Sequence, residues 1–260
     1  MIKMDAVVLA GGKMALDDPL YAQGVDGSRS LVDVLGKPMV QWVVDALDAS
    51  DCVAEMYVIG LPTSYRLKAT KPVHYLPDQG DIFENIRCGV VQATQDHPSR
   101  SKVLIASSDI PAIQPSMIDW LASEVAADPG LMMYYNVVEQ STMEARFPQS
   151  NRSYVRFKDI AVCGGDLNVI DKSLFAEERL IWQKLANARK HPLKQAGLLG
   201  IDSLIMVALH ILTLEGAVKR VCKRLGIKAK ALRCPHAEIA MDADKPHQLA
   251  ILRQHLEERV

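Results

Sequence analysis

Short apolar runs alternate with helical patterns through the first half of the chain, and this alternation restricts the fold more than any other feature. The runs are rich in β-branched residues and end at Gly, Pro or Ser, as buried strands do. The predicted strands are 4–9, 55–60, 73–76 and 102–107. The predicted helices are 39–49 after Pro38, 82–93, and 117–127 with Ser116 as its cap. Such alternation favours an α/β fold in three layers, a mostly parallel sheet with helices on both faces.

The second half has a different character. Predicted strands at 131–139, 154–157 and 166–170 are separated only by turn sequences, which favours a small antiparallel extension. Helices are expected at about 171–189 and 201–225, followed by a last strand at 237–241 and a terminal helix. The chain of 260 residues is therefore interpreted as a single domain, 1–260, with halves at 1–130 and 131–260 and a helical insertion in the second half.

One apolar stretch, 198–214, approaches the length of a membrane span but is interrupted by Asp202 and His210. A buried helix, or the subunit interface of a homodimer at 201–214, is therefore the preferred interpretation, and contact with a membrane surface or a lipid-like acceptor is the alternative. No membrane span is predicted.

Charge and cysteine usage restrict the partners. A net charge of -1 gives no long-range attraction to nucleic acid or to an anionic membrane, so we expect a small ligand and no nucleic acid partner. The five cysteines are far apart and include no C-x-x-C pair, which argues against a disulfide framework or a zinc site. With no secretory signal pattern at residue 1, a cytoplasmic location is expected.

Two features are predicted to meet at the carboxyl ends of the strands, where sheets of this kind bind ligands. The first is Leu9-Ala10-Gly11-Gly12, a tight turn whose glycines allow backbone N–H groups to approach an anion or a base edge. The second is Asp109, which follows another buried strand. The turn matches neither the G-x-G-x-x-G fingerprint nor the phosphate-binding P-loop, which argues against dehydrogenases and P-loop enzymes.

Further segments carry a resemblance to a known family. Arg29 stands eight positions before Lys37 in Gly-Lys-Pro, and Gly80, Ser108-Asp109-Ile-Pro111, Gly164-Gly165-Asp-Leu-Asn168 and Met241-Asp242-Ala-Asp244-Lys-Pro246 follow. With Leu-Ala-Gly-Gly, these segments resemble the nucleotidyltransferase superfamily, and most closely its branch of molybdenum-cofactor guanylyltransferase-like NTP transferase domains. The resemblance spans nearly the whole chain and implies a Rossmann-like nucleotidyltransferase fold, with residues 1–130 binding the nucleotide and 131–260 the acceptor.

The resemblance implies an Mg²⁺-dependent transfer of a nucleoside monophosphate from a nucleoside triphosphate to a phosphorylated small-molecule acceptor, with release of pyrophosphate. Arg29 stands where the family usually has a lysine and is the expected catalytic cation, with Lys13 as a second candidate. The expected metal ligands are Asp109, Asp242 and Asp244. For Asp244 the alternative is that it only caps the following helix.

The resemblance also implies contacts to both substrates. The expected nucleotide-binding residues are Leu9, Ala10, Gly11, Gly12, Gly80, Asn85 and Ser108. The expected acceptor-binding residues are Gly164, Gly165 and Asn168, for which the alternative is a plain hairpin turn. Four nearby cations are either a site for the acceptor phosphate or an exposed cationic strand face: Arg146, Arg152, Arg156 and Lys158.

Two other functions remain open at this stage. A nucleotide-sugar-dependent glycosyltransferase of the related fold would usually carry Asp-x-Asp at the mid-chain metal site, where this chain has Ser107-Ser108-Asp109. A non-catalytic nucleotide-binding protein is the other alternative, because Arg29 replaces the family's lysine.

Overall fold

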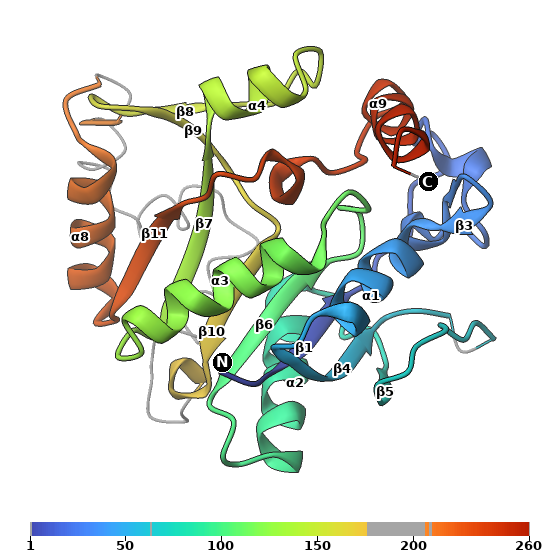
Figure 1. Cartoon of the computed structure of the whole chain (residues 1–260), viewed down its shortest axis with the longest axis horizontal. Coiled ribbons are helices and arrows are strands. Elements are labelled where there is room, and N and C mark those ends of the chain that lie inside the picture. The colour runs from blue at the N-terminus through green and yellow to red at the C-terminus, as the bar shows by residue number, and fades with distance from the viewer. Residues whose placement is uncertain (1, 63, 176–205, 208–209, 260) are drawn as a thin grey trace.

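The described residues of this computed structural model, 2–62, 64–175, 206–207 and 210–259, include nine strands in one mixed sheet (Figure 1). Four strands on one side of the sheet are parallel neighbours, in the order β5 (Val73–Leu76), β4 (Val53–Ile59), β1 (Met4–Leu9) and β6 (Lys102–Ser107). The α/β fold expected from the sequence is confirmed, and β1, β5 and β6 have the predicted bounds.

The other side of the sheet is largely antiparallel, as expected. β10 (Leu167–Asp171) pairs antiparallel with β6 and with β7 (Met133–Glu139). β7 continues antiparallel to β9 (Ala161–Gly164), which pairs with β8 (Val155–Arg156). β11 (Ala229–Arg233) lies parallel to β7.

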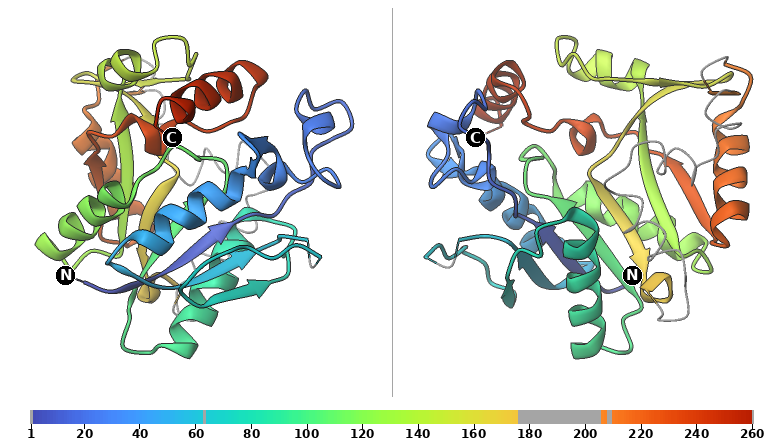
Figure 2. Two further views of the ribbon diagram at one scale, coloured as in Figure 1. Left: turned by 45° about the vertical axis from the view of Figure 1, so that its right-hand side comes forward. Right: turned by 180° about the vertical axis from the view of Figure 1, so that it is seen from behind.

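Alternate residues of the central strands enter two separate hydrophobic cores. Ala6 and Val8 of β1 join the core shared with α1 (Met39–Ala49), α3 (Pro115–Ala127) and α9 (Pro246–Glu257). Val7 points to the other face and joins the core with α2 (Ile82–Asp96). Figure 2 shows α2 on the side of the sheet opposite α1 and α3. Burial on both faces explains why these strands are continuously apolar.

The remaining elements are shorter. α4 (Gln140–Arg146) follows β7, and α8 (Leu214–Leu225) packs on β11. β2 (Asp33–Val34) and β3 (Lys37–Pro38) form a small ribbon before α1. Short 3-10 turns lie at Tyr21–Gln23, Arg29–Leu31, Lys172–Phe175 and Ala237–Ala240. Of the helices in the described ranges, none is long and apolar enough to cross a membrane.

The predictions for the second half were partly wrong. The predicted strand at 237–241 is instead a 3-10 turn at Ala237–Ala240, and Met241 ends it by donating its N–H to Glu238 O. All five side chains are buried, so the apolar pattern alone could not separate this turn from a buried strand. β9 and β11 were not predicted. Thr213 caps α8, which begins at Leu214 and not at 201. Most of the predicted helix at 171–189 lies outside the described residues, as do residues 198–205 and 208–209 of the apolar stretch.

One predicted cap was also wrong. α3 begins at Pro115, one residue before the predicted cap Ser116, and its N-cap is Gln114. Proline at the first position has no N–H to satisfy, so the start of this helix does not depend on the Ser116 hydroxyl.

Candidate active site

A cavity of about 400 Å³ opens at the carboxyl ends of β1 and β6. Four segments that are distant in sequence line it, and they include most of the residues expected to contact the nucleotide. The lining residues are Leu9, Gly11–Met14, Arg29, Ser30, Asp78, Gly80–Ile82, Asn85 and Ser107–Asp109. The structure therefore brings together the Gly-Gly turn, Arg29, Gly80 and Asp109, as expected from the sequence.

The Gly-Gly turn after β1 is held by close backbone packing. Gly12 has a φ of 90°, and Gly60 at the end of β4 has a φ of 83°. A Cβ added to Gly60 would lie 2.3 Å from the Cα of Gly11, so the two backbones approach more closely than any side chain allows. Gly60 was not among the predicted site residues.

Asp78, also absent from the predictions, joins the Gly-Gly turn to the loop before α2. Its carboxylate accepts hydrogen bonds from Gly12 N at 3.3 Å, Gly80 N at 2.9 Å and Asn85 Nδ2 at 2.9 Å. The bonds from Asn85 and Gly80 lower the pKa of Asp78. Asn85 Oδ1 in turn accepts from Gln79 N at 2.7 Å. Asn85 thus braces the loop, while Asp81 caps α2 through Phe83 N and Glu84 N.

Two buried serines connect the Arg29 segment to the ends of β1 and β6. Ser30 Oγ donates to Ala10 O at 2.9 Å and lies 2.8 Å from Ser108 Oγ. Because the single hydroxyl hydrogen of Ser30 goes to Ala10, Ser108 is the donor between the two hydroxyls. Ser108 N also donates to Leu9 O at 3.2 Å, and Ala10 N donates to Ile59 O at 2.9 Å. Ser30 and Ser108 both line the cavity and form its floor.

Asp109 lies next to this floor, and its buried carboxylate oxygen Oδ1 has no hydrogen-bond partner among the described residues. Burial, and then the charge of Asp244, raise the pKa of Asp109. Ala243 N donates to Asp109 O at 3.0 Å, so the segment before α9 is tied to the end of β6. Asp109 and Asp244 are therefore neighbours although they are 135 positions apart in the sequence.

Asp166 is a further acid at this edge that the sequence did not predict. β9 and β10 both pair with β7, and the register changes from Val137↔Gly164 to Tyr134↔Val169, so the residues between them form a bulge. The Oδ2 atom of Asp166 is buried and finds no hydrogen-bond partner in the part of the chain that the structure describes. Burial, and then the charge of Asp109, raise the pKa of Asp166 to about 7.

These acids suit a hard divalent cation that is held by few protein ligands. Two buried carboxylate oxygens without partners, with Asp244 close by, are the environment that a bound cation would neutralise. Among the described residues, no three potential ligands converge tightly enough to enclose a metal ion alone. The arrangement fits Mg²⁺, which takes one or two carboxylates and completes its octahedron with phosphate oxygens and water.

Arg29 and the two C-terminal aspartates, Asp242 and Asp244, take part in three ion pairs. Arg29 contacts Asp244 and also Asp18, with 2.7 Å between Nη2 and Oδ2. Asp242 pairs instead with Arg152, which comes from the second half of the chain. The N-cap of α9 is Lys245, with no capping side chain, so the alternative that Asp244 only caps this helix does not hold. Lys13 is exposed at the rim of the cavity.

The predicted acceptor residues have structural partners of their own. Asn168 Oδ1 accepts from Asn136 N at 2.8 Å and Asn168 Nδ2 donates to Gly165 O at 2.8 Å, so this side chain holds the bulge. A Cβ on Gly164 would lie 2.4 Å from the Tyr135 hydroxyl, and one on Gly165 would lie 3.1 Å from the Asn136 Cβ. These three residues do not line the described cavity. Their contact with an acceptor remains a prediction, but the alternative of a plain hairpin is wrong because β9 and β10 share β7.

The predicted cationic cluster is divided between different acids. Arg146 Nε donates to Glu238 at 3.0 Å, and Arg152 pairs with Asp242. Two of its four members are therefore ion-paired rather than part of an exposed cationic strand face.

Comparison with known proteins agrees with this geometry. Residues 6–200 match the family of MobA-like NTP transferase domains. A probable molybdenum cofactor guanylyltransferase of Pyrococcus horikoshii is 23% identical over 123 residues, 47% of this chain. The match spans little more than half of that relative, 57% of its length.

Solved structures extend the similarity over the whole chain. A hypothetical transferase from Thermus thermophilus is 32% identical with a TM-score of 0.80, covering 95% of this chain and 100% of that chain. A synthetase for CMP-2-keto-3-deoxy-manno-octonic acid, complexed with CTP, shares the fold with a TM-score of 0.61 at 14% identity, covering 99% of this chain and 100% of that one.

Proposed function

The chain belongs to the MobA-like NTP transferase domain family and is a nucleotidyltransferase. On this premise we propose that it uses Mg²⁺ to transfer a nucleoside monophosphate to a phosphorylated small molecule. The observation that carries the proposal is Asp109, which lines the cavity with the Gly11-Gly12 turn and has a buried carboxylate oxygen without a hydrogen-bond partner among the described residues. Asp166, within electrostatic reach of Asp109, has a second such oxygen. Buried carboxylates without a cationic partner are costly, and a cation–triphosphate complex is a ligand that offsets this cost.

The proposed reaction forms one P–O bond and breaks another. An anionic oxygen of the acceptor phosphate attacks the α-phosphorus, and the bond to the β-phosphate oxygen breaks to release pyrophosphate. A phosphate monoester with a second pKa of about 6 is already anionic at neutral pH, so no strong general base is needed. Bound Mg²⁺ would neutralise charge on the phosphate oxygens.

The residues of this chain then have separate tasks. Backbone N–H groups of the Gly11-Gly12 turn approach the phosphates, and Asp78 with Asn85 holds the loop that flanks the nucleoside. Asp109 and Asp244 would hold the cation, and Arg29 would stabilise charge around the α-phosphate. The acceptor approaches from the side of residues 131–260, where Gly164 and Gly165 allow close packing.

GTP is the first triphosphate to test, because the curated relative is named as a guanylyltransferase. Isothermal titration of GTP, ATP, CTP and UTP with Mg²⁺ identifies the nucleotide, and pyrophosphate release with a panel of sugar and pterin phosphates identifies the acceptor class. We expect one triphosphate to bind in an Mg²⁺-dependent manner. Binding of nucleotide diphosphate sugars in preference to every triphosphate would instead support a glycosyltransferase, and tight binding without turnover would support a non-catalytic role.

The site assignment is tested with Asp109→Asn, which keeps the size of the side chain and removes its charge. Loss of a metal-ligating carboxylate should lower the rate of pyrophosphate release by about 1000-fold, more than the about 10- to 100-fold typical of residues that only support a ligand. Asp51→Asn, at an exposed position, is the matched control and should retain full activity. Equal activity of the two variants would contradict the assignment of Asp109.

A further inference from the structure

Arg29 holds two carboxylates at once, and the two differ in how firmly they are fixed. Asp18 is largely buried, with 14% of its side chain exposed, and its Oδ1 accepts from Leu20 N at 2.9 Å while its Oδ2 faces Arg29. The Asp244 side chain is 50% exposed, and among the described residues Arg29 is the hydrogen-bond partner recorded for its carboxylate. The Nη2 end of the guanidinium is therefore held by a largely buried carboxylate, and the Nη1 end contacts a carboxylate that is half exposed to solvent.

The same Asp244 carboxylate belongs to the acid cluster that suits a divalent cation. Its charge raises the pKa of both Asp109 and Asp166, so it lies within electrostatic reach of both. Arg29 opposes this effect at Asp109. A cation at Asp109 and Asp244 would thus be placed next to the positive guanidinium, and the two would compete for the same oxygen atoms.

We propose that Arg29 and the divalent cation occupy Asp244 in turn, an inference that rests on the proposed function. Without nucleotide, Arg29 neutralises Asp244. When the cation–triphosphate complex enters, Asp244 passes to the cation, and the freed end of the guanidinium turns to the phosphates. Asp18 keeps the other end in place throughout and is therefore a positioning residue.

The chemistry of arginine supports this exchange. A guanidinium is a planar fork that engages two acceptors along different N–H directions, whereas an ammonium is a compact point charge. Only the fork can remain on Asp18 while its other arm moves from a carboxylate to a phosphate, because both partners accept the same kind of charge-assisted hydrogen bond. An arginine at position 29 can therefore exchange one partner while it keeps Asp18, which a lysine would do poorly.

Manganese titration followed by electron paramagnetic resonance tests the exchange without measuring turnover. Arg29→Gln should raise the affinity for free Mn²⁺ in the absence of nucleotide by about tenfold, because Asp244 is released. The same variant should bind Mn²⁺ together with α,β-methylene GTP, or the matching analogue of the preferred triphosphate, about tenfold more weakly, because a phosphate contact is lost. Arg29→Lys should show both changes in smaller measure.

Two further variants separate the roles of the carboxylates. Asp18→Asn should weaken binding of the Mn²⁺–analogue complex without raising the affinity for free Mn²⁺. Asp244→Asn should weaken binding of free Mn²⁺, and adding Arg29→Gln to it should cause no further gain. Opposite shifts in Arg29→Gln support the exchange, whereas an unchanged or reduced affinity for free Mn²⁺ would overturn it. Failure of the unaltered protein to bind Mn²⁺ with any triphosphate analogue would instead contradict the proposed function.

Discussion

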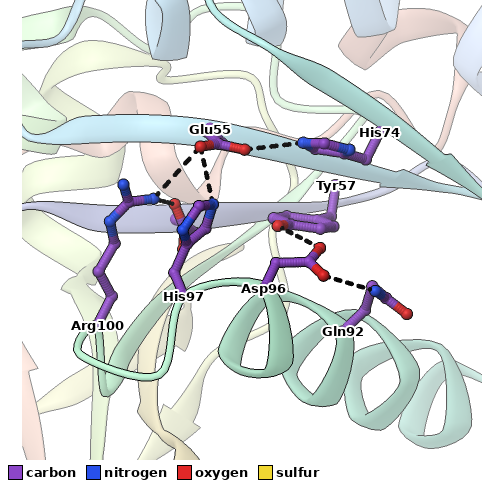
Figure 3. A network of polar contacts seen from close by, with 8 residues as sticks. Glu55, Tyr57, His74, Gln92, Asp96, His97 and Arg100 are labelled. Carbon is purple, nitrogen blue, oxygen red and sulfur yellow. Dashed lines mark hydrogen bonds and ion pairs between the residues drawn. The ribbon is translucent and has the colours of Figure 1, made fainter.

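Buried acidic side chains at the two edges of the parallel strands differ in their ion pairing. At the amino edge, Asp5 at the start of β1 pairs with Arg100, and Glu55 in β4 lies 2.8 Å from both His74 and His97 (Figure 3). Asp5 also keeps one buried oxygen, Oδ2, without a hydrogen-bond partner among the described residues, but its Oδ1 contacts Arg100. At the carboxyl edge, Asp109 and Asp166 each keep such an oxygen too, and among the described residues neither carboxylate forms an ion pair. The pKa is raised at all three aspartates. The fold therefore places a cation directly on the buried acid at the amino edge, whereas at the carboxyl edge Arg29 and Arg152 pair with Asp244 and Asp242 and not with Asp109 or Asp166.

The partners at the amino edge also join the sheet to α2. Tyr57 donates to Asp96 at 2.9 Å, and Gln92 donates to the other oxygen of Asp96 at 3.0 Å. Burial opposes ionisation of Glu55, but hydrogen bonds from His74 and His97 hold its pKa below the usual range. Burial still raises the pKa of Asp5, although Arg100 opposes this. This edge is therefore a structural network, and its loss should affect stability and not nucleotide binding.

Removal of Arg100 should have the largest effect on the amino edge. Arg100→Ala leaves the carboxylate of Asp5, which is only 1% exposed, without its partner, and we expect a loss of about 3 kcal/mol in the free energy of unfolding. Urea denaturation measures this loss. Arg87→Ala removes an exposed pair with Glu84 and should cost no more than about 0.5 kcal/mol. Nucleotide affinity should be unchanged in both variants, and a loss of affinity in Arg100→Ala would show that the two edges are coupled.

At the carboxyl edge, removal of the Asp166 charge by Asp166→Asn should stabilise the protein at pH 8. The pKa of Asp166 in the folded state is about 7, above that of an unfolded aspartate, so the folded protein binds a proton that the unfolded chain releases. The stability from this proton is fully present below about pH 4 and is lost as the pH rises towards 7. Asp166→Asn should therefore be more stable than the unaltered protein at pH 8, by about 2 kcal/mol, and equally stable at pH 4.

Urea denaturation at several pH values between 4 and 8, with a chelator present, checks this dependence. Asp51→Asn, at an exposed aspartate, should show no such difference between the two ends of the range. Destabilisation by Asp166→Asn at pH 8 would mean that the carboxylate has a compensating partner, and the contrast between the edges would disappear.

The fold of the first half of the chain was easier to predict from the sequence than that of the second half. β1, β5, β6 and α1 were predicted with their correct bounds, because buried parallel strands and amphipathic helices leave local apolar patterns. β11 has the sequence Ala-Lys-Ala-Leu-Arg, in which only Leu232 is fully buried. No local pattern identifies such a strand, because it depends on pairing with β7 almost a hundred residues earlier in the chain.

The site shows the same limit. Gly11, Gly12, Asp109 and Asp244 lie in short motifs that resemble a family, and the structure places them together. Asp18, Asp78 and Asp166 were missed because their surroundings are tertiary. The neighbours of Asp166 depend on a bulge between β9 and β10, and those of Asp78 depend on the approach of two glycine-containing turns. Only Pro77-Asp78 beside Gly80 offered a local signal, as a turn sequence at the end of a strand.

The smaller of the two effects predicted for the amino edge distinguishes a network from a set of independent pairs. His74 stacks on Tyr57 at 4.7 Å and contacts Glu55, but its side chain is 42% exposed. After His74→Ala, Glu55 keeps His97 at 2.8 Å and Arg100 at 3.7 Å, so its charge remains compensated. We therefore expect a loss of only about 0.5 to 1 kcal/mol by urea denaturation at pH 7. A loss as large as that of Arg100→Ala would mean that the amino edge acts as one cooperative unit, in which no single partner is dispensable.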